Sequence, residues 1–268
     1  MMEEQMQPER GYYEQGDIWE AARYMADFEQ ARLAACRRAI PKDARTHLDV
    51  GAGNGVFLQG IEDEGLAGSR FGIERATTAA RAAICKAPLL VGDAAHLPFA
   101  DRSIDLVSAL DVVEHFPYGL YEKAMGEIGR VSARYILLNV PYREHRLHAV
   151  CPYCNCRFDP HFHMRRFEDS SFAALFPGFD VVTVERVNRA ESVLEAALRP
   201  FRHTVFGGFP PYGVCPQCNY RQQSQAGSGG AGSLAVARDI VRRVVRAFPK
   251  VGVPAEIVVL YRRSAENP

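Results

Sequence analysis

The stretch HLDVGAGNG, residues 47–55, predicts a strand that runs into a glycine-rich turn. Leu48 and Val50 form a short apolar strand that breaks into a turn, and VFLQGIEDEG, residues 56–65, follows as a helix. Three glycines make the turn: Gly51, Gly53 and Gly55. They let the backbone approach a ligand, while the helix N-terminus offers unpaired N–H groups to a carboxylate or phosphate. We therefore predict a β-loop-α unit with a ligand at its turn.

The same alternation of strand and helix continues along the chain. The apolar patterns predict further strands at 69–74, 88–93, 104–110, 134–140, 179–187 and 255–263. They predict helices at 17–40, 76–87, 121–132, 170–176 and 234–248, and a flexible glycine- and serine-rich loop at 224–233. Strands that alternate with helices indicate an α/β fold, here a doubly wound sheet of about seven strands, mostly parallel. Its ligand should lie at the carboxyl ends of the strands.

Acidic residues occur at the ends of three successive predicted strands. Glu74 ends the second strand about 20 residues after the glycine turn, where a carboxylate can accept both hydroxyls of a ribose. Asp93 ends the third strand, and with the N–H of Ala94 it can pair with an adenine. Asp49 precedes the glycines and is a candidate to face a ligand ammonium. Together these positions predict a nucleoside site.

Four motifs in order, LDVGAGNG, FGIE, VGDAAHLPFADRSIDLV and SALDVVEHF, resemble class I SAM-dependent methyltransferases of the methyltransferase type 11 kind. The resemblance covers residues 44–141 and implies a Rossmann-like fold with S-adenosyl-L-methionine as cofactor. It implies cofactor contacts at Asp49, Gly51, Ala52, Gly53, Gly55, Glu74, Asp93, Ala94 and Asp111. Asp111 would line the methionine end of the site, whereas Asp105, at the start of its strand, is expected to be structural.

The resemblance also suggests roles around the reacting methyl group. His115 is the candidate catalytic base, with Glu114 beside it, although either can merely pack there. The N-terminal segment folds over the cofactor in many such enzymes. Its aromatic residues Tyr12, Tyr13 and Trp19 can therefore stack on the cofactor or staple the segment to the domain.

Two C-P-x-C knuckles, Cys151–Cys154 and Cys215–Cys218, indicate a small inserted lobe that binds zinc. Four thiolates complete a tetrahedral structural Zn²⁺ site with no open position. Cys156, His161 and His163 lie close enough in sequence to replace one of them. A redox pair and an iron–sulfur cluster are the alternatives, but a redox pair usually opens a thioredoxin-like helix and a cluster needs tighter cysteine grouping.

The lobe follows the fifth predicted strand, so we expect it to shape the acceptor site. The stretch HFHMRRF offers a cluster that can bind an acidic or sugar-like acceptor, or form a solvated loop. Its members are His161, His163, Arg165 and Arg166.

Composition limits the remaining choices. The 268 residues are 47% hydrophobic, enough for one substantial core. Lys and Arg number 32, as do Asp and Glu, so no long-range field attracts nucleic acid, and a small-molecule acceptor is expected instead. An acidic N-terminus and the lack of about 20 consecutive apolar residues predict a cytoplasmic protein without a membrane span.

The expected organisation is an N-terminal helical or lid segment at 1–43, a cofactor-binding core at 44–141, an insertion with a core helix and strand at 142–223, and a loop, helix and last strand at 224–268. The function expected is methyl transfer to a small molecule or a cell-envelope precursor. Two alternatives stay open: an NAD-dependent oxidoreductase, and a non-catalytic zinc-containing binding module on the same fold.

Overall fold

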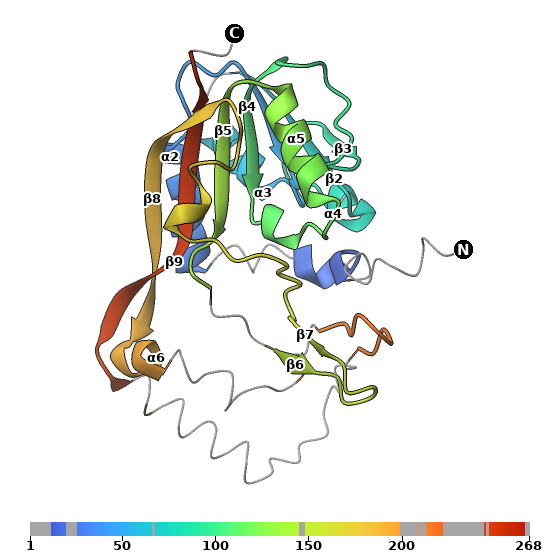
Figure 1. Cartoon of the computed structure of the whole chain (residues 1–268), viewed down its shortest axis with the longest axis vertical. Coiled ribbons are helices and arrows are strands. Elements are labelled where there is room, and N and C mark those ends of the chain that lie inside the picture. The colour runs from blue at the N-terminus through green and yellow to red at the C-terminus, as the bar shows by residue number, and fades with distance from the viewer. Residues whose placement is uncertain are drawn as a thin grey trace. The chain divides into compact units, whose positions relative to one another are not determined.

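A seven-stranded sheet forms the centre of the fold in the computed structural model (Figure 1). The structure describes residues 12–19, 26–65, 68–144, 148–198, 209, 213–221, 244 and 247–265. The strands are β1 (Thr46–Val50), β2 (Ser69–Glu74), β3 (Leu89–Val91), β4 (Ile104–Leu110), β5 (Ser132–Pro141), β8 (Phe179–Ser192) and β9 (Lys250–Arg263). Their order is β3-β2-β1-β4-β5-β9-β8. Strands β1 to β5 pair in parallel, whereas β9 is antiparallel to β5, which confirms the predicted mostly parallel sheet.

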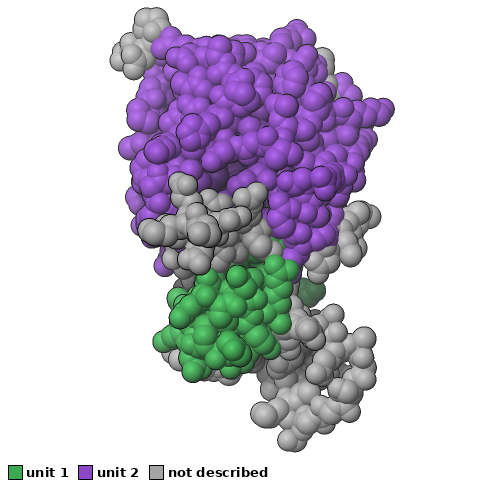
Figure 2. Space-filling model, turned by 90° about the vertical axis from the view of Figure 1, so that its right-hand side faces the viewer, with its two compact units in different colours: residues 1–12, 145–163, 188–253 green, residues 13–144, 164–187, 254–268 purple. Residues whose placement is uncertain are grey.

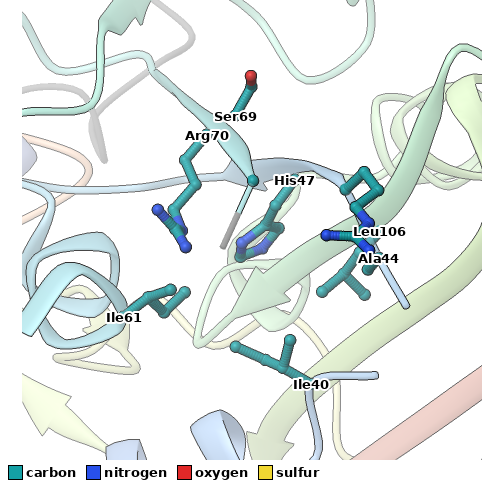
Figure 3. Close-up of a pocket in the computed structure, with 9 residues that line it drawn as sticks. Ile40, Ala44, His47, Ile61, Ser69, Arg70 and Leu106 are labelled. Carbon is teal, nitrogen blue, oxygen red and sulfur yellow. The ribbon is translucent and has the colours of Figure 1, made fainter. Parts of the chain in front are cut away.

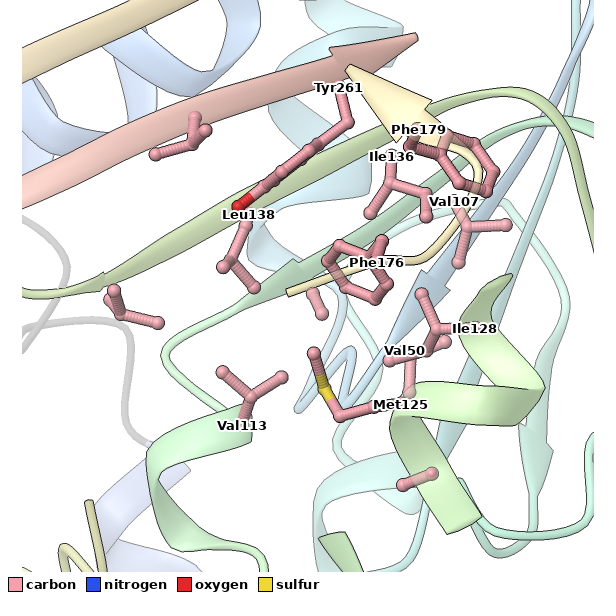
Figure 4. Packing of buried hydrophobic residues seen from close by; sticks show 14 of the residues in the cluster. Val50, Val107, Val113, Met125, Ile128, Ile136, Leu138, Phe176, Phe179 and Tyr261 are labelled. Carbon is pink, nitrogen blue, oxygen red and sulfur yellow. The ribbon is translucent and has the colours of Figure 1, made fainter. Parts of the chain in front are cut away.

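Helices cover both faces of this sheet. They are α2 (Asp27–Arg38), α3 (Val56–Asp63), α4 (Thr77–Arg81) and α5 (Tyr121–Val131), with short 3₁₀ helices η2 (Gly16–Trp19), η4 (Val113–His115) and η5 (Asp169–Ser171). On one face, Met125 and Ile128 of α5 pack with Val50 and with Phe176 (Figure 4). On the other face, α2 and α3 contribute Leu33 and Leu58 to a second core. No helix in the described ranges is long and apolar enough to cross a membrane.

The chain divides into two compact units, coloured separately in Figure 2. The large unit comprises residues 13–144, 164–187 and 254–268 and contains the parallel strands and the helices α2 to α5. The small unit comprises residues 1–12, 145–163 and 188–253. It contains the hairpin of β6 (Ala149–Val150) and β7 (Arg157–Phe158), together with α6 (Val193–Leu198).

One predicted helix is shorter in the structure because contacts from distant residues replace helical hydrogen bonds. The helix expected at 76–87 ends at Arg81. Beyond it, the N–H of Ile84 donates to the carbonyl of Asn54, and the N–H groups of Lys86 and Ala87 donate to the carboxylate of Glu62.

The helix expected at 170–176 is wrong: only η5 forms there. Pro177 disfavours a helical conformation at Phe176, and Gly178 follows with a positive φ of 78°. Of the helix expected at 17–40, η2 and α2 are present, and residues 20–25 lie outside the described ranges. The loop at 224–233 and most of the helix at 234–248 also lie outside them.

A small pocket lies at the amino-terminal ends of the parallel strands. His47 of β1, Arg70 of β2 and Leu106 of β4 line it, with Ile40 and Ile61 (Figure 3). The predicted structural role of Asp105 is confirmed at these ends, because its carboxylate accepts hydrogen bonds from the N–H groups of Arg45 and Thr46. These bonds hold the start of β1 against β4.

Candidate functional site

The glycine turn after β1 is anchored on β2 and has no room for side chains. Gly51, Gly53 and Gly55 have φ values of 73°, 56° and 81°, the left-handed region that favours glycine. The N–H groups of Gly51 and Ala52 donate to the carbonyl of Ile73 at 2.8 and 3.1 Å. A Cβ atom on Gly51 would lie 2.4 Å from the side chain of Val112. The turn is thus a fixed concave backbone, as a closely bound ligand requires.

Glu74 closes the turn from the end of β2. Its Oε2 atom accepts a hydrogen bond of 2.9 Å from the N–H of Gly53, and Oε1 accepts one of 2.7 Å from Ala76. Burial raises the pKa of this carboxyl, and the hydrogen bonds from the backbone oppose that rise. A carboxylate has about four acceptor positions, and the backbone N–H groups of Gly53, Ala76 and Arg75 use about three of them, so Glu74 retains capacity to accept from a ribose hydroxyl.

Asp93 lies just beyond β3, and its Oδ1 atom accepts a hydrogen bond of 2.9 Å from the N–H of Ala95. This bond shapes the turn that contains Ala94. Because β3, β2 and β1 are adjacent and parallel, their carboxyl ends lie side by side at the same end of the sheet. The structure therefore brings the glycine turn, Glu74 and Asp93 together in a row, in the arrangement that the spacing predicted.

Asp49 lies one residue before Val50 and is 3% exposed. The hydroxyl of Ser108 donates to its Oδ1 atom at 2.5 Å. Burial and the nearby charge of Glu74 raise the pKa of Asp49 to about 7, and the hydrogen bond from Ser108 opposes that rise. Its contact with a ligand ammonium remains a prediction.

Asp111 follows β4 with a positive φ of 51° and joins a polar network at the same end of the sheet. Arg32 of α2 forms an ion pair of 2.9 Å with Asp111 and donates to the side-chain oxygen of Asn139 at 2.9 Å. Asn139 in turn donates to Glu256 of β9 at 3.2 Å. Burial and the nearby charge of Asp111 hold the pKa of Glu256 well above its ordinary value.

Sequence reasoning missed three members of this network: Arg32, Asn139 and Glu256. The signal for Glu256 was a single acid in the otherwise apolar strand AEIVVLY. A strand buried on both faces rarely holds a carboxyl that has no partner. The sequence did not reveal which residue that partner was.

The N-terminal segment lies against the turn and the residues after β4. A Cβ atom on Gly53 would lie 2.8 Å from the ring of Trp19, and the side-chain amide of Asn54 donates to the carbonyl of Trp19 at 3.0 Å. The ring of Tyr13 meets that of His115 edge-on, at 5.6 Å between centroids. Glu14 accepts hydrogen bonds from the N–H groups of Thr77 and Thr78, both at 3.0 Å.

His115 lies in η4, beside the almost fully buried Glu114. Its Nε2 atom is 3.8 Å from a carboxylate oxygen of Glu114, too long for a hydrogen bond but close enough for electrostatic attraction. Arg165, which the sequence grouped with a candidate acceptor-binding cluster, stacks on the ring of Tyr121 at 3.6 Å and donates to the carbonyl of Phe116. These contacts give Arg165 a structural role.

The four cysteines of the two knuckles converge. Their sulfur atoms all lie within 4.8 Å of one another, with Cys151 to Cys218 at 3.6 Å and Cys154 to Cys215 at 3.5 Å. Sulfur atoms about 2.3 Å from a tetrahedral zinc ion are about 3.8 Å apart, so the four residues fit the ion. The Cys151 sulfur also accepts hydrogen bonds from the N–H groups of Tyr153 and Cys154, which favour a thiolate.

The substitute ligands considered from the sequence are not part of this group. Among the described residues of the small unit, the group of mutually close ligand atoms consists of the four knuckle cysteines, and it contains neither Cys156 nor His161 nor His163. The rings of the two histidines lie 5.7 Å apart and face each other. Cys151 and Cys215 are fully buried in a small apolar cluster with Ala149 and Phe158.

Comparison with known proteins gives the class of the domain. Residues 48–134 match the family model described as a methyltransferase domain. No curated protein sequence matches the chain. A SAM-dependent methyltransferase from Archaeoglobus fulgidus is 18% identical, with a TM-score of 0.54 over 90% of this chain and 96% of that one.

Two further solved structures have the same fold. One chain of the complex between the Haloferax volcanii Trm112 methyltransferase activator and a methyltransferase is 16% identical, with a TM-score of 0.53 over 92% of this chain and 95% of that one. A methyltransferase from Bacillus halodurans is 13% identical, with a TM-score of 0.52 over 87% and 99%. Residues 48–134 therefore match a methyltransferase domain, and the chain shares the Rossmann-like fold of these solved structures.

Proposed function

We propose that this chain transfers the methyl group of S-adenosyl-L-methionine to a small-molecule acceptor, such as a cell-envelope precursor. The observation that carries the proposal is the row formed by the glycine turn, Glu74 and Asp93 at the ends of three adjacent parallel strands. A row of this kind can hold a nucleoside, because ribose hydroxyls and an adenine amino group need acceptors at separate positions.

The cofactor would follow the edge of the sheet from β3 to β4. Asp93 and the N–H of Ala94 would pair with adenine, and Glu74 would accept from the ribose. The backbone of Gly51, Ala52, Gly53 and Gly55 would allow close approach, while Asp49 and Asp111 would attract the positive methionine end. The bound cofactor supplies a sulfonium methyl group that a nucleophile can displace.

The residues around Asp111 would keep its carboxylate in place during the reaction. Arg32 holds it through an ion pair of 2.9 Å and is itself held by the hydrogen bond of 2.9 Å that it donates to Asn139, so little reorganisation is needed when the cofactor cation arrives. Positioning of this kind supplies most of the catalysis in a displacement at a methyl group.

Residues 13–19 would form a lid that excludes water from the cofactor. Support comes from the contacts of Trp19 with the glycine turn and of Tyr13 with His115. His115 is the candidate base for an acceptor that holds a proton at neutral pH. Glu114 would favour its protonated form after the proton is accepted.

The four-cysteine cluster would hold one structural Zn²⁺ ion. Cys151, Cys154, Cys215 and Cys218 fill all four tetrahedral positions, so the ion would stabilise the small unit and take no part in the chemistry.

Balanced charge supports a small-molecule acceptor over nucleic acid, because 32 basic and 32 acidic residues leave no net attraction to a polyanion. The proposed location is the cytoplasm.

The test has two stages. Calorimetric titration with S-adenosylhomocysteine, with NAD as comparator, should show micromolar binding of the former alone. Incubation with methyl-labelled cofactor and pools of small acceptors should then transfer label to one fraction. Tight NAD binding would favour an oxidoreductase, and binding of neither compound by metal-loaded protein would favour a non-catalytic module.

A further inference from the structure

A chain of hydrogen bonds runs through the interior of the large unit beneath the glycine turn. Nε2 of His47 lies 2.7 Å from Oγ of Ser108, and Oγ lies 2.5 Å from Oδ1 of Asp49. The three residues are at most 6% exposed. Asp49 and Ser108 face each other in the parallel pairing of β1 with β4, and His47 shares the face of Asp49 because it lies two residues away on one strand.

This series of hydrogen bonds has two self-consistent arrangements because a hydroxyl has a single proton to donate. When Asp49 is ionised, Ser108 donates to it, and His47 donates to Ser108 from Nε2–H. When Asp49 is protonated, it donates to Ser108, and Ser108 donates to an Nε2 atom without a proton. A neutral His47 then holds its proton on Nδ1. The ionisation of Asp49 is thus linked to the tautomer of His47.

His47, at the end of this series of hydrogen bonds, lines the small pocket where the strands begin (Figure 3). Since Ser108 engages Nε2, Nδ1 is the ring nitrogen left to exchange a proton with water there. Burial and the nearby cation of Arg70 lower the pKa of His47 to about 3. His47 therefore stays neutral near pH 7 and can pass a proton on without storing it.

We propose that Ser108 and His47 are positioning residues that set the charge of Asp49 by relaying its proton to the pocket at the opposite end of the sheet. The proton of the Asp49 carboxyl moves to Oγ of Ser108, the hydroxyl proton moves to Nε2 of His47, and the Nδ1 proton moves to water. One O–H or N–H bond breaks as each new one forms, and no electrons are exchanged.

The relay rests on the proposed function for its driving force. The ammonium of a cofactor near Asp49 would favour the carboxylate, and the proton must then leave a buried site. Glu74 of β2 faces Asp49 with a like charge, which opposes ionisation until a cation arrives. The thiols of Cys36 on α2 and Cys85 after α4 also face it, and their raised pKa values keep them neutral.

The first experiment uses the free protein and does not depend on a cofactor. Nitrogen-15 NMR of labelled histidines between pH 5 and 9 should show neutral His47 changing from the Nδ1–H to the Nε2–H form near pH 7. Ser108→Ala should abolish the change, and Ser108→Thr, which keeps the hydroxyl, should restore it. A tautomer that stays constant in the unaltered protein would overturn the proposal.

The second experiment titrates S-adenosylhomocysteine into the protein at pH 6.5, in buffers of different ionisation enthalpy. Binding should release up to one proton, and Asp49→Asn should reduce that number toward zero. Binding with no proton release would overturn the relay and leave the proposed function standing. No binding at all would count against the proposed function, and the tautomer measurement would still decide the relay.

Discussion

The Oε2 atom of Glu74 accepts a 2.9 Å hydrogen bond from the backbone N–H of Gly53. This bond joins the acid at the end of β2 to the glycine turn after β1. The carboxylate that is expected to bind the ribose therefore also holds the backbone that is proposed to face the cofactor. A change at Glu74 should affect binding through both contacts.

Replacing Glu74 with alanine should weaken binding of S-adenosylhomocysteine by about 1–3 kcal/mol, because charge-assisted hydrogen bonds are lost. Calorimetric titration measures the effect. Glu185→Ala is a matched control, since Glu185 forms an ion pair with Arg38 that is exposed on both sides. Equal affinity of the Glu74 variant and the unaltered protein would mean that the ribose binds elsewhere.

Arg32→Met should lower the free energy of unfolding by about 3 kcal/mol, because it leaves Asp111 and Asn139 without their buried cation. Urea unfolding gives the value. Arg38→Met on the same helix removes only the exposed pair with Glu185 and should cost less than about 1 kcal/mol. Similar losses in the two variants would show that the network contributes little.

Asp49 and His47 should have opposite effects on the pH dependence of stability. The pKa of Asp49 is raised from 3.8 to about 7. Its contribution to the free energy of unfolding is therefore full below pH 4 and is lost as the pH rises toward 7. The pKa of His47 is lowered from 6.5 to about 3, so its contribution is present above pH 6.5 and is lost as the pH falls toward 3.

Urea unfolding between pH 4 and 7.5 tests this opposition. Relative to the unaltered protein, Asp49→Asn should gain stability as the pH rises, whereas His47→Gln should lose it. Each difference should span a few kcal/mol, since one pKa unit corresponds to about 1.4 kcal/mol. Differences that are flat, or that have the same sign, would contradict the assigned pKa directions.

Cys151→Ser should release zinc and destabilise the small unit while the seven-stranded sheet stays folded. Metal analysis by mass spectrometry and two-probe thermal unfolding measure the two effects. Cys156→Ser is the control, because Cys156 is outside the group of four close sulfur atoms. Loss of metal from the control, or retention in Cys151→Ser, would refute the ligand assignment.

Local patterns made much of the candidate site predictable. The glycine turn, Glu74 and Asp93 follow from apolar runs that end in glycine or acid at strand spacing. The helix at 76–87 was overestimated for a physical reason: alanine-rich residues favour a helix, but the N–H groups of Ile84 and Ala87 bond to Asn54 and Glu62 from α3 and its preceding turn. Intrinsic propensity does not include such distant acceptors.

The amino-acid pattern was enough to predict the parallel α/β sheet, the row of the glycine turn, Glu74 and Asp93 at the strand ends, and the convergence of the two cysteine knuckles. These depend on residue period and on motifs that span a few positions. The partners of the buried polar groups, in contrast, could be read only from the folded chain. Arg32 lies 107 positions from Asn139, and Ser108 lies 61 from His47. Hydrogen-bond partners of buried groups are fixed by strand pairing and helix packing, which join residues that no local pattern connects.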